Sequence, residues 1–302
     1  MESEILQIVR TEGPMTGAEI SDALGAKDGL LLWRSCRLSQ DLVLRRVGTR
    51  YLRLDRRVDG FARLSPSILR EFLTYTVVGS PDSPLALTRK ADQLASHIEA
   101  VSQAKARLAH TVISALIDRF EEAFPLRDHA CFILGGDIVY GMAHDVPRAE
   151  RSTGKLVRGS DMDLVVVLND RFPKRLMHRL DETIYQEKFR LLRTPHIREE
   201  IDYVVKDERR VRQQLAFDTF KHMVACKILE EGTFLHGSET LFHTLKAMLR
   251  ERGIIDRLHR LEASALAFRK EAEETLLLRD LREINNDDIS LFYPAEESEE
   301  FE

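Results

Sequence analysis

The segment Gly159–Leu168, with the sequence Gly-Ser-Asp-Met-Asp-Leu-Val-Val-Val-Leu, constrains the fold of this chain more than any other segment. Its last four residues are β-branched or aliphatic, and such a run predicts a buried strand. Asp161 and Asp163 stand two residues apart at the start of that strand, so their side chains emerge from the same face of an extended chain. The segment therefore predicts a buried strand with two carboxylates at its mouth.

Two carboxylates in this arrangement indicate a metal site. They would lie about 6.5–7 Å apart and can bind a pair of divalent cations separated by about 3.5–4 Å. Without a cation they would repel each other by several kcal/mol at an effective dielectric constant of about 20. Because the chain gains no structural stability from that repulsion, we interpret the pair as a binding site for divalent metal ions.

A third carboxylate is expected from a neighbouring strand. Residues 200–205 read Glu-Ile-Asp-Tyr-Val-Val, in which the apolar residues Ile201, Tyr203 and Val205 recur at every second position. We favour Asp202 over Glu200 as the third acid, because Asp202 lies inside the apolar run. The alternative is that Asp202 is only a polar residue on a half-exposed strand.

A glycine pair follows a second predicted strand. Cys131–Leu134 is a short apolar run that leads into Gly135 and Gly136, and the next residues are expected to open a helix. Glycine lets the backbone approach a ligand closely, and N–H groups at the start of a helix favour phosphate oxygens. Taken alone, the glycine pair is equally compatible with an ordinary turn.

Together these segments resemble the polymerase-β-like nucleotidyltransferase superfamily. Its pattern is a strand, a Gly-Ser turn with another glycine four residues on, a hydrophobic-Asp-x-Asp motif, and a third acid on a later strand. Residues 228–237 resemble the helix and turn that often close the minimal domain. The resemblance covers roughly residues 100 to 240. The positions in this chain that match the pattern are Gly136, Asp137, Gly141, Asp161, Asp163 and Asp202.

The resemblance implies an α/β (α+β) fold, a mixed-sheet nucleotidyltransferase palm with helical flanks. It implies Mg²⁺ (or Mn²⁺) bound by the catalytic residues Asp161, Asp163 and Asp202, with an NTP as substrate and Asp202 placed to activate the acceptor hydroxyl. Lys227 is an alternative to Lys221 for contact with the triphosphate, and each lysine is alternatively a solvated helix residue. The residues expected around the nucleotide are Gly135, Gly136, Asp137, Gly141, Ser160 and Lys221.

This chain departs from the superfamily pattern in two places. Asp137 stands where the family has a serine that contacts the triphosphate. An acid there repels phosphate unless it joins the metal shell or points away. Residues 142–158 are also longer than the matching segment of minimal members, and we interpret them as an acceptor-binding loop or a lid.

Residues 1–58 are predicted to form a winged helix-turn-helix domain. Thr16 and Glu19 have the spacing of a capping box at the start of its second helix. The strands of its wing are expected to pair as a hairpin through Gly48-Thr49-Arg50. The other expected elements are a first helix around residues 5–9, a third helix at Gly29–Leu38, and strands at Val43–Val47 and Tyr51–Leu54.

Arginine is enriched in the part of this domain that would meet a nucleic acid. Residues 30–57 contain eight arginines and two acids, while the whole chain has a formal net charge of -5. The third helix and the wing are where such a module meets phosphates. The alternative is a module used only for dimerisation or protein contacts. The arginines predicted to bind DNA or RNA are Arg34, Arg37, Arg45, Arg46 and Arg50.

The remaining segments complete the expected organisation. Residues 59–99 are predicted to be a helical linker, residues 100–240 the nucleotidyltransferase domain, and residues 241–290 C-terminal helices. Residues 291–302, with five glutamates and no periodicity, are predicted to be an acidic tail. Leu108, Val112, Leu116 and Phe120 follow one another at i+4 and predict a long helix packed against a sheet.

Cysteine content and hydropathy bound the compartment. The three cysteines are odd in number and widely spaced, which argues against a disulfide framework and favours a reducing cytoplasm. No segment has the roughly 18 consecutive apolar residues of a membrane span. We therefore expect a cytoplasmic protein with no membrane partner.

Three classes of function remain open. The first is a nucleotidyltransferase that transfers a nucleoside monophosphate to a hydroxyl of RNA, protein or a small molecule. The second is a DNA-binding transcriptional regulator whose transferase fold serves as a nucleotide sensor. The third is a scaffold or antitoxin-like partner whose acids serve structure. The three acids favour the first class, and the arginine-rich domain supports the second.

Overall fold

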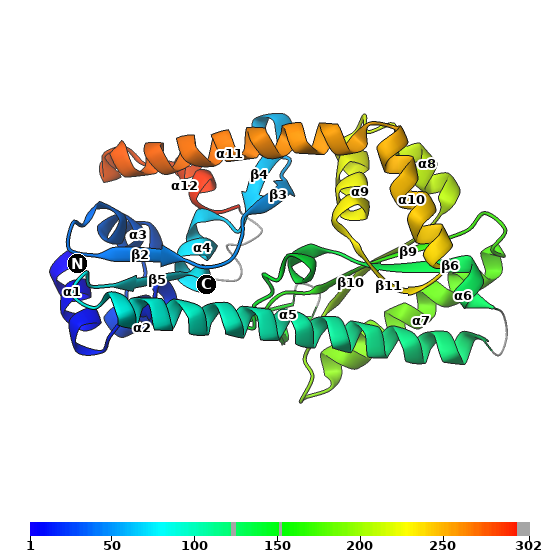
Figure 1. The fold of residues 1–302 in the computed structure, drawn as a ribbon, viewed down its shortest axis with the longest axis horizontal. Coiled ribbons are helices and arrows are strands. Elements are labelled where there is room, and N and C mark those ends of the chain that lie inside the picture. The colour runs from blue at the N-terminus through cyan, green and yellow to red at the C-terminus, as the bar shows by residue number, and fades with distance from the viewer. Residues whose placement is uncertain (122–124, 151–152, 295–302) are drawn as a thin grey trace. The chain divides into compact units, whose positions relative to one another are not determined.

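A computed structural model describes residues 1–121, 125–150 and 153–294 of the chain. The chain divides into two compact units, one made of residues 1–98 with 262–302 and the other of residues 99–261. The fold is α+β, because each unit combines helices with small sheets (Figure 1). The acidic tail expected at 291–302 lies outside the described residues from 295 onward.

A four-stranded mixed sheet forms the centre of the second unit. Its order is β10-β9-β6-β11, with β9 and β10 parallel and the other two pairs antiparallel. The predicted strand at residues 165–168 is confirmed as the second half of β9. The strands are β6 (Ala130–Leu134), β9 (Met162–Leu168), β10 (Ile201–Asp207) and β11 (Thr233–Gly237).

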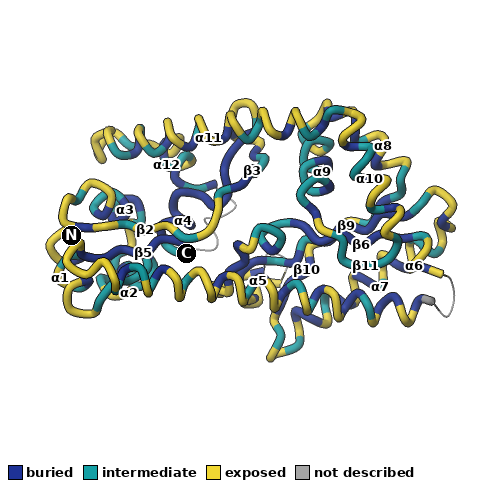
Figure 2. The backbone as a smooth tube through the Cα atoms, in the orientation of Figure 1, coloured by how far each residue is buried: buried dark blue, intermediate teal, exposed yellow. Residues whose placement is uncertain are grey.

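Helices cover both faces of this sheet (Figure 1). On one face the core joins α5 (Pro84–Glu121) and α7 (Lys174–Arg193) to the alternate strand residues Phe132, Leu164 and Val166. The predicted stripe on α5 is confirmed, because Val112, Leu116 and Phe120 are buried in that core. The opposite face, which includes Ile133, meets α9 (Phe220–Glu231) and α10 (Glu239–Glu251). Strands β6 and β9 are accordingly buried along most of their length (Figure 2).

Short elements connect the strands of the second unit. The glycine pair leads into a 3-10 helix, η2 (Gly136–Tyr140), rather than a longer helix. The segment 142–158 contains a β-hairpin of β7 (Pro147–Ala149) and β8 (Leu156–Arg158). The helix and turn expected at residues 228–237 are the end of α9 and strand β11, an edge strand of the sheet. The remaining helices of this unit are α6 (Leu126–His129) and α8 (Glu208–Gln214).

The N-terminal helices of the first unit follow the sequence closely. The capping box is confirmed, since Glu19 N–H donates to the Thr16 hydroxyl and Thr16 N–H donates to the Glu19 carboxylate. Gly25, in the left-handed region with φ of 60°, ends the same helix. The helices are α1 (Glu2–Thr11), α2 (Gly17–Leu24) and α3 (Gly29–Leu38), the last with the predicted bounds.

The hairpin predicted at residues 43–54 is wrong. Strand β2 (Val43–Arg46) pairs with β5 (Thr76–Gly79), whereas β3 (Tyr51–Leu54) pairs with β4 (Ala62–Ser65). Strand β5 is buried along its whole length and lies between β1 (Met15–Thr16) and β2 in a three-stranded sheet. A buried β-branched strand is the better partner for β2 because its side chains complete the core. Sequence proximity alone suggested the hairpin.

The C-terminal helices belong to the core of the first unit. Ala272, Leu276 and Phe292 are buried together with Trp33 of α3. Residues 59–99, expected as a helical linker, hold two strands as well as α4 (Ile68–Tyr75) and the start of α5. Among the described residues no helix is long and apolar enough to cross a membrane. The other elements are η1 (Asp59–Phe61), α11 (Ile254–Leu278), η3 (Leu281–Glu283) and α12 (Asn286–Phe292).

Candidate metal centre

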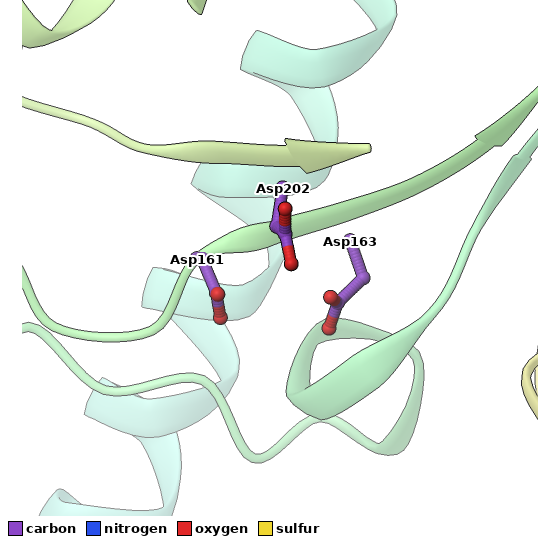
Figure 3. A group of neighbouring side chains, drawn as sticks. All are labelled: Asp161, Asp163 and Asp202. Carbon is purple, nitrogen blue, oxygen red and sulfur yellow. The ribbon is translucent and has the colours of Figure 1, made fainter. Parts of the chain in front are cut away.

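The structure brings the three predicted acids together. Asp161 directly precedes β9, Asp163 is the second residue of β9, and Asp202 is the second residue of β10. The parallel register places Asp202 opposite Asp163. One carboxylate oxygen from each residue lies within 4.8 Å of the other two. Figure 3 shows the three carboxylates converging from the two neighbouring strands.

Electrostatics make this cluster unfavourable without a cation. Desolvation and then the neighbouring Asp161 raise the pKa of Asp163 well above its usual value. The pKa of Asp161 is raised by desolvation, which outweighs the lowering effect of Arg148. The Asp161 side chain is nevertheless 38% exposed, so an ion from solvent can reach it. Carboxylate oxygens are the ligands that Mg²⁺ and Mn²⁺ prefer, and the donor set therefore fits a divalent cation.

Asp137 adds a fourth carboxylate to the same region. Its charge raises the pKa of both Asp161 and Asp163. The Ser160 hydroxyl donates a hydrogen bond of 2.9 Å to Asp137 Oδ2, and accepts one of 3.2 Å from the backbone N–H of His144. Ser160 is 5% exposed and holds Asp137 in place. Asp137 is therefore part of the acidic cluster.

The glycine turn packs against Asp163. Gly135 N–H donates to the backbone oxygen of Asp163 at 2.9 Å, and Gly136 N–H donates to Glu231 Oε1 at 3.3 Å. Gly136 has a φ of 69°, and a Cβ atom there would overlap the Asp163 carboxylate. Gly141 ends η2 in the left-handed region. Gly135 and Gly136, which were predicted to approach a phosphate, thus allow the Asp163 side chain to pack closely against the turn. Their two N–H groups donate hydrogen bonds within the protein.

Glu231 is a residue that sequence analysis missed. Its side chain is 2% exposed, forms an ion pair with Lys227, and accepts a 2.7 Å hydrogen bond from the Tyr140 hydroxyl. Lys227, also 5.6 Å from the centre of the Tyr140 ring, is the helix lysine beside the site. Lys221 is exposed in the first turn of α9. The two lysines are six positions apart in the helix, about 9 Å along the axis and on different faces. The predicted contact of Lys221 with a triphosphate stays a prediction.

Arg148 and Glu200 flank the cluster on its other side. The Arg148 guanidinium donates to the Gly159 carbonyl at 2.8 Å and to Glu200 Oε2 at 2.9 Å, and lies 3.8 Å from Asp161 Oδ2. Glu200 also lies 3.6 Å from Lys188 Nζ. Glu200 is therefore paired with two cations, whereas the Asp202 carboxylate lies close to those of Asp161 and Asp163. The basic residues in the segment 142–158 were the only sequence signal for Arg148.

The five arginines predicted to bind nucleic acid differ in their surroundings. Arg34 donates to the backbone oxygens of Leu276 and Arg279 at 2.8 and 2.7 Å, so the C-terminal helix engages it. Arg50 pairs with Glu71 and Glu273 and is 25% exposed. The side chains of Arg34 and Arg50 therefore have their partners within the first unit. The exposed members of the set are Arg37, Arg45 and Arg46.

Comparisons with protein-family models, with curated proteins and with solved structures give no match. The candidate site is therefore defined by this chain's own geometry. Three convergent carboxylates on adjacent strands can hold one or two divalent cations at the edge of a buried sheet. Arg148 and Lys227 are the cations placed beside them.

Proposed function

We propose that this protein is a metal-dependent nucleotidyltransferase, which transfers a nucleoside monophosphate from an NTP to an acceptor hydroxyl. The observation that carries the proposal is the group of Asp161, Asp163 and Asp202, with ligand atoms within 4.8 Å of one another on two adjacent parallel strands. The sequence resemblance to the polymerase-β-like superfamily supplies the reaction class. The same three positions match its catalytic acids.

Each acid has a role that follows from its position. Asp161 and Asp163 would hold Mg²⁺ or Mn²⁺, which when bound supplies the positive charge that offsets the negative charge of a triphosphate. Asp202 is exposed on β10 and faces the other two acids, so it is placed to orient an acceptor hydroxyl and take its proton. Such a site works mainly by positioning and charge neutralisation.

The residues beside the acids define where a nucleotide would fit. Asp137, Asp161 and Asp163 form a negative wall that a phosphate approaches only with metal ions in place. Arg148 lies 3.8 Å from Asp161 and pairs with Glu200, and Lys227 pairs with Glu231, whose charge acts on Asp163. Ser160 and the glycines were also predicted to bind the nucleotide. In this proposal their role is indirect, because they position the carboxylates of Asp137 and Asp163.

The first unit supports a proposed nucleic-acid role. Its three helices and its small sheet of order β1-β5-β2 support a winged-helix interpretation. Arg37, Arg45 and Arg46 are exposed on α3 and β2 and supply the cations that phosphates require. The related second candidate is a DNA-binding regulator that senses nucleotides at the acidic site. These exposed arginines are the observation that favours it.

Nucleotide transfer to total RNA and to cell lysate tests the proposal. The protein is incubated with each labelled NTP in turn and with Mg²⁺ or Mn²⁺, and RNA and protein fractions are separated. We expect one or more nucleotides to label one fraction, which identifies the acceptor class. Asp161→Asn, Asp163→Asn and Asp202→Asn should each reduce labelling by at least 100-fold, by analogy with the loss of a catalytic electrostatic group.

Asp128→Asn, an exposed aspartate on α6, is the matched control and should label like the native protein. Calorimetry with NTP and metal separates the two candidates. Metal-dependent NTP binding without any transfer would select the nucleotide sensor, whereas absence of both binding and transfer would reject the nucleotide site altogether.

A further inference from the structure

Each strand of the β7–β8 hairpin is held by contacts of a basic side chain, one from helix α5 and one from β7 itself. Lys105 of α5, 3% exposed at its side chain, donates to the Arg158 carbonyl on β8 at 2.6 Å and pairs with Glu199. Arg148 of β7, 12% exposed, donates to the Gly159 carbonyl and to Glu200. These contacts fix the hairpin to the rest of the second unit, and Arg148 extends from a strand whose position is fixed.

The two acceptors of Arg148 lie where the metal-binding strands begin. Gly159 precedes Asp161 by two residues, and Glu200 precedes Asp202 by two residues. The same junction is joined by a 2.9 Å hydrogen bond from Met162 N–H to the Glu200 carbonyl. One guanidinium therefore ties the backbone entering β9 to the side chain entering β10. A planar fork with several donors suits such a double contact, whereas a lysine ammonium does not reproduce it.

The backbone beside Arg148 has little freedom to adjust. Gly159 has a φ of 58° and packs so closely that a Cβ atom there would overlap the His144 carbonyl. Ser160 N–H donates to that same carbonyl at 3.0 Å. The two residues before Asp161 are thus each fixed by a hydrogen bond, Gly159 to the Arg148 guanidinium and Ser160 to the His144 carbonyl. The direction of the Asp161 side chain depends on this segment.

The positive charge of Arg148, taken alone, would weaken metal binding at the acids instead of supporting it. Its Nη2 lies 3.8 Å from Asp161 Oδ2, so a positive charge there competes with a metal ion for that carboxylate. Glu200, at 2.9 Å, is the closer partner and neutralises most of this charge. The contact with Glu200 and Gly159 is therefore the larger effect on the site. A positioning role and a purely electrostatic role predict changes of opposite sign in metal affinity.

We propose that Arg148 is the positioning residue of the metal centre, which fixes Asp161 and the β9–β10 junction through Gly159 and Glu200. This inference rests on the proposed metal site but not on the identity of the nucleotide or the acceptor. It also gives the segment 142–158 a function, because the hairpin carries the group that sets the ligand geometry. Residues that orient metal ligands typically change metal affinity by about 10–100-fold when they are replaced.

Mn²⁺ binding to the full chain without nucleotide tests the proposal, with free Mn²⁺ measured by electron paramagnetic resonance. The decisive variant is Arg148→Gln combined with Glu200→Gln, which breaks the ion pair and leaves the net charge of the chain unchanged. We expect its Mn²⁺ dissociation constant to rise by about tenfold or more. Arg148→Lys keeps the charge but loses the fork, and should weaken binding in the same direction.

Arg158→Gln is the control on the same hairpin. The Lys105 contact uses the backbone carbonyl of residue 158, which this substitution keeps, so the variant should bind Mn²⁺ like the native protein. Circular dichroism and the unfolding midpoint establish that each variant is folded. Unchanged or tighter Mn²⁺ binding by the folded double variant would overturn the positioning role. If the double variant does not fold, Arg148→Lys decides by the same criterion.

Failure of the proposed function is distinguishable from failure of this inference. A native protein that binds Mn²⁺ but transfers no nucleotide loses the proposed activity, while the Arg148 comparison retains its meaning. A native protein that does not bind Mn²⁺ overturns the metal centre and the role of Arg148 together. Where transfer is observed, the double variant should raise the Mn²⁺ concentration needed for half-maximal rate by the same factor as its dissociation constant.

Discussion

Gly136 is the residue whose identity the site most strictly requires. Its positive φ of 69° disfavours any other residue, and the space that a Cβ would need is taken by the Asp163 carboxylate. Gly141, five residues on, has a similar φ of 64° but nothing within 4 Å of its Cβ position. Comparing substitutions at the two glycines therefore separates the effect of backbone strain from the effect of displacing the Asp163 carboxylate.

We expect Gly136→Ala to displace Asp163 and to weaken Mn²⁺ binding by at least about tenfold, the scale of a disturbed ligand shell. Gly141→Ala should cost only backbone strain, about 1–2 kcal/mol of unfolding free energy, and should leave Mn²⁺ binding unchanged. Titration with Mn²⁺ and urea denaturation of both variants provide the comparison. Equal loss of metal affinity in both would contradict the steric argument.

Lys206 of β10 shows how burial changes the charge balance of the sheet. It is 5% exposed and donates to Gln214 Oε1 at 2.9 Å. Desolvation lowers its pKa to about 8. Because its pKa in the unfolded chain is higher, the unfolded state binds a proton that the folded state has lost between about pH 8 and 10.5. Lys206 therefore makes the folded state more stable as pH rises through this window.

Lys206→Met should remove this dependence. We expect the unfolding free energy of the native protein, relative to the variant, to increase by up to about 1.4 kcal/mol per pH unit above pH 8. The difference between the two proteins is the quantity to measure, by urea denaturation at several pH values. The raised pKa of buried Cys131 acts in the opposite direction and is common to both proteins, whereas Cys226, whose pKa the Lys206 charge lowers, is replaced by Ser in both. A difference that does not vary with pH would contradict the lowered pKa.

At the scale of elements, helix α2 is defined by side chains at its two ends. Thr16 and Glu19 satisfy backbone N–H groups at its start, and Glu19 also pairs with Lys90 of α5 at 2.7 Å. Gly25 ends it in a conformation that other residues adopt at a cost. The eight residues between the Thr16 cap and Gly25 therefore form a helix whose first and last residues are determined by neighbouring side chains and backbone.

Thr16→Ala should therefore destabilise the protein by about 1 kcal/mol, the usual cost of losing a helix cap. Thr11→Ala is the matched control, because the Thr11 hydroxyl only donates back to the Gln7 carbonyl within α1. Urea denaturation followed by circular dichroism gives both values. A loss for Thr16→Ala no greater than that for Thr11→Ala would show that the cap contributes nothing.

At the scale of the whole molecule, the first unit is closed by residues far apart in sequence. Arg269 of α11, 5% exposed at its side chain, pairs with Glu71 at 3.2 Å and Glu273 at 2.6 Å, and donates to the Pro66 carbonyl at 2.8 Å. Desolvation lowers its pKa, while the charge of Glu71 opposes this shift. The second unit has its own core around β6, β9 and α5.

Arg269→Gln should therefore loosen the first unit selectively. Removing one partner of a buried ion pair costs about 3–5 kcal/mol. We expect faster hydrogen–deuterium exchange across residues 1–98 and 262–294 of the full chain. Exchange within β6 and β9 of the second unit should be unchanged. Uniformly faster exchange along the chain would show that the two units unfold as one.

The sequence by itself determined the elements whose signals are local. An apolar run predicted β9, the spacing of Asp161 and Asp163 placed both acids at its mouth, and the pair Thr16 and Glu19 predicted the start of α2. Asp202 was predicted because apolar residues alternate around it. These patterns lie within a few residues, where backbone geometry fixes which side chains share a face.

Only the tertiary structure decided which distant groups meet. The parallel register sets Asp202 opposite Asp163, and β2 pairs with β5 instead of β3. Arg148 lies 3.8 Å from Asp161, and the charge of Glu231 acts on Asp163. Strand partners are selected by the apolar surface they bury together, and a buried charge by the partner that offsets its desolvation. Both quantities depend on residues far apart in the chain, and no local pattern contains them.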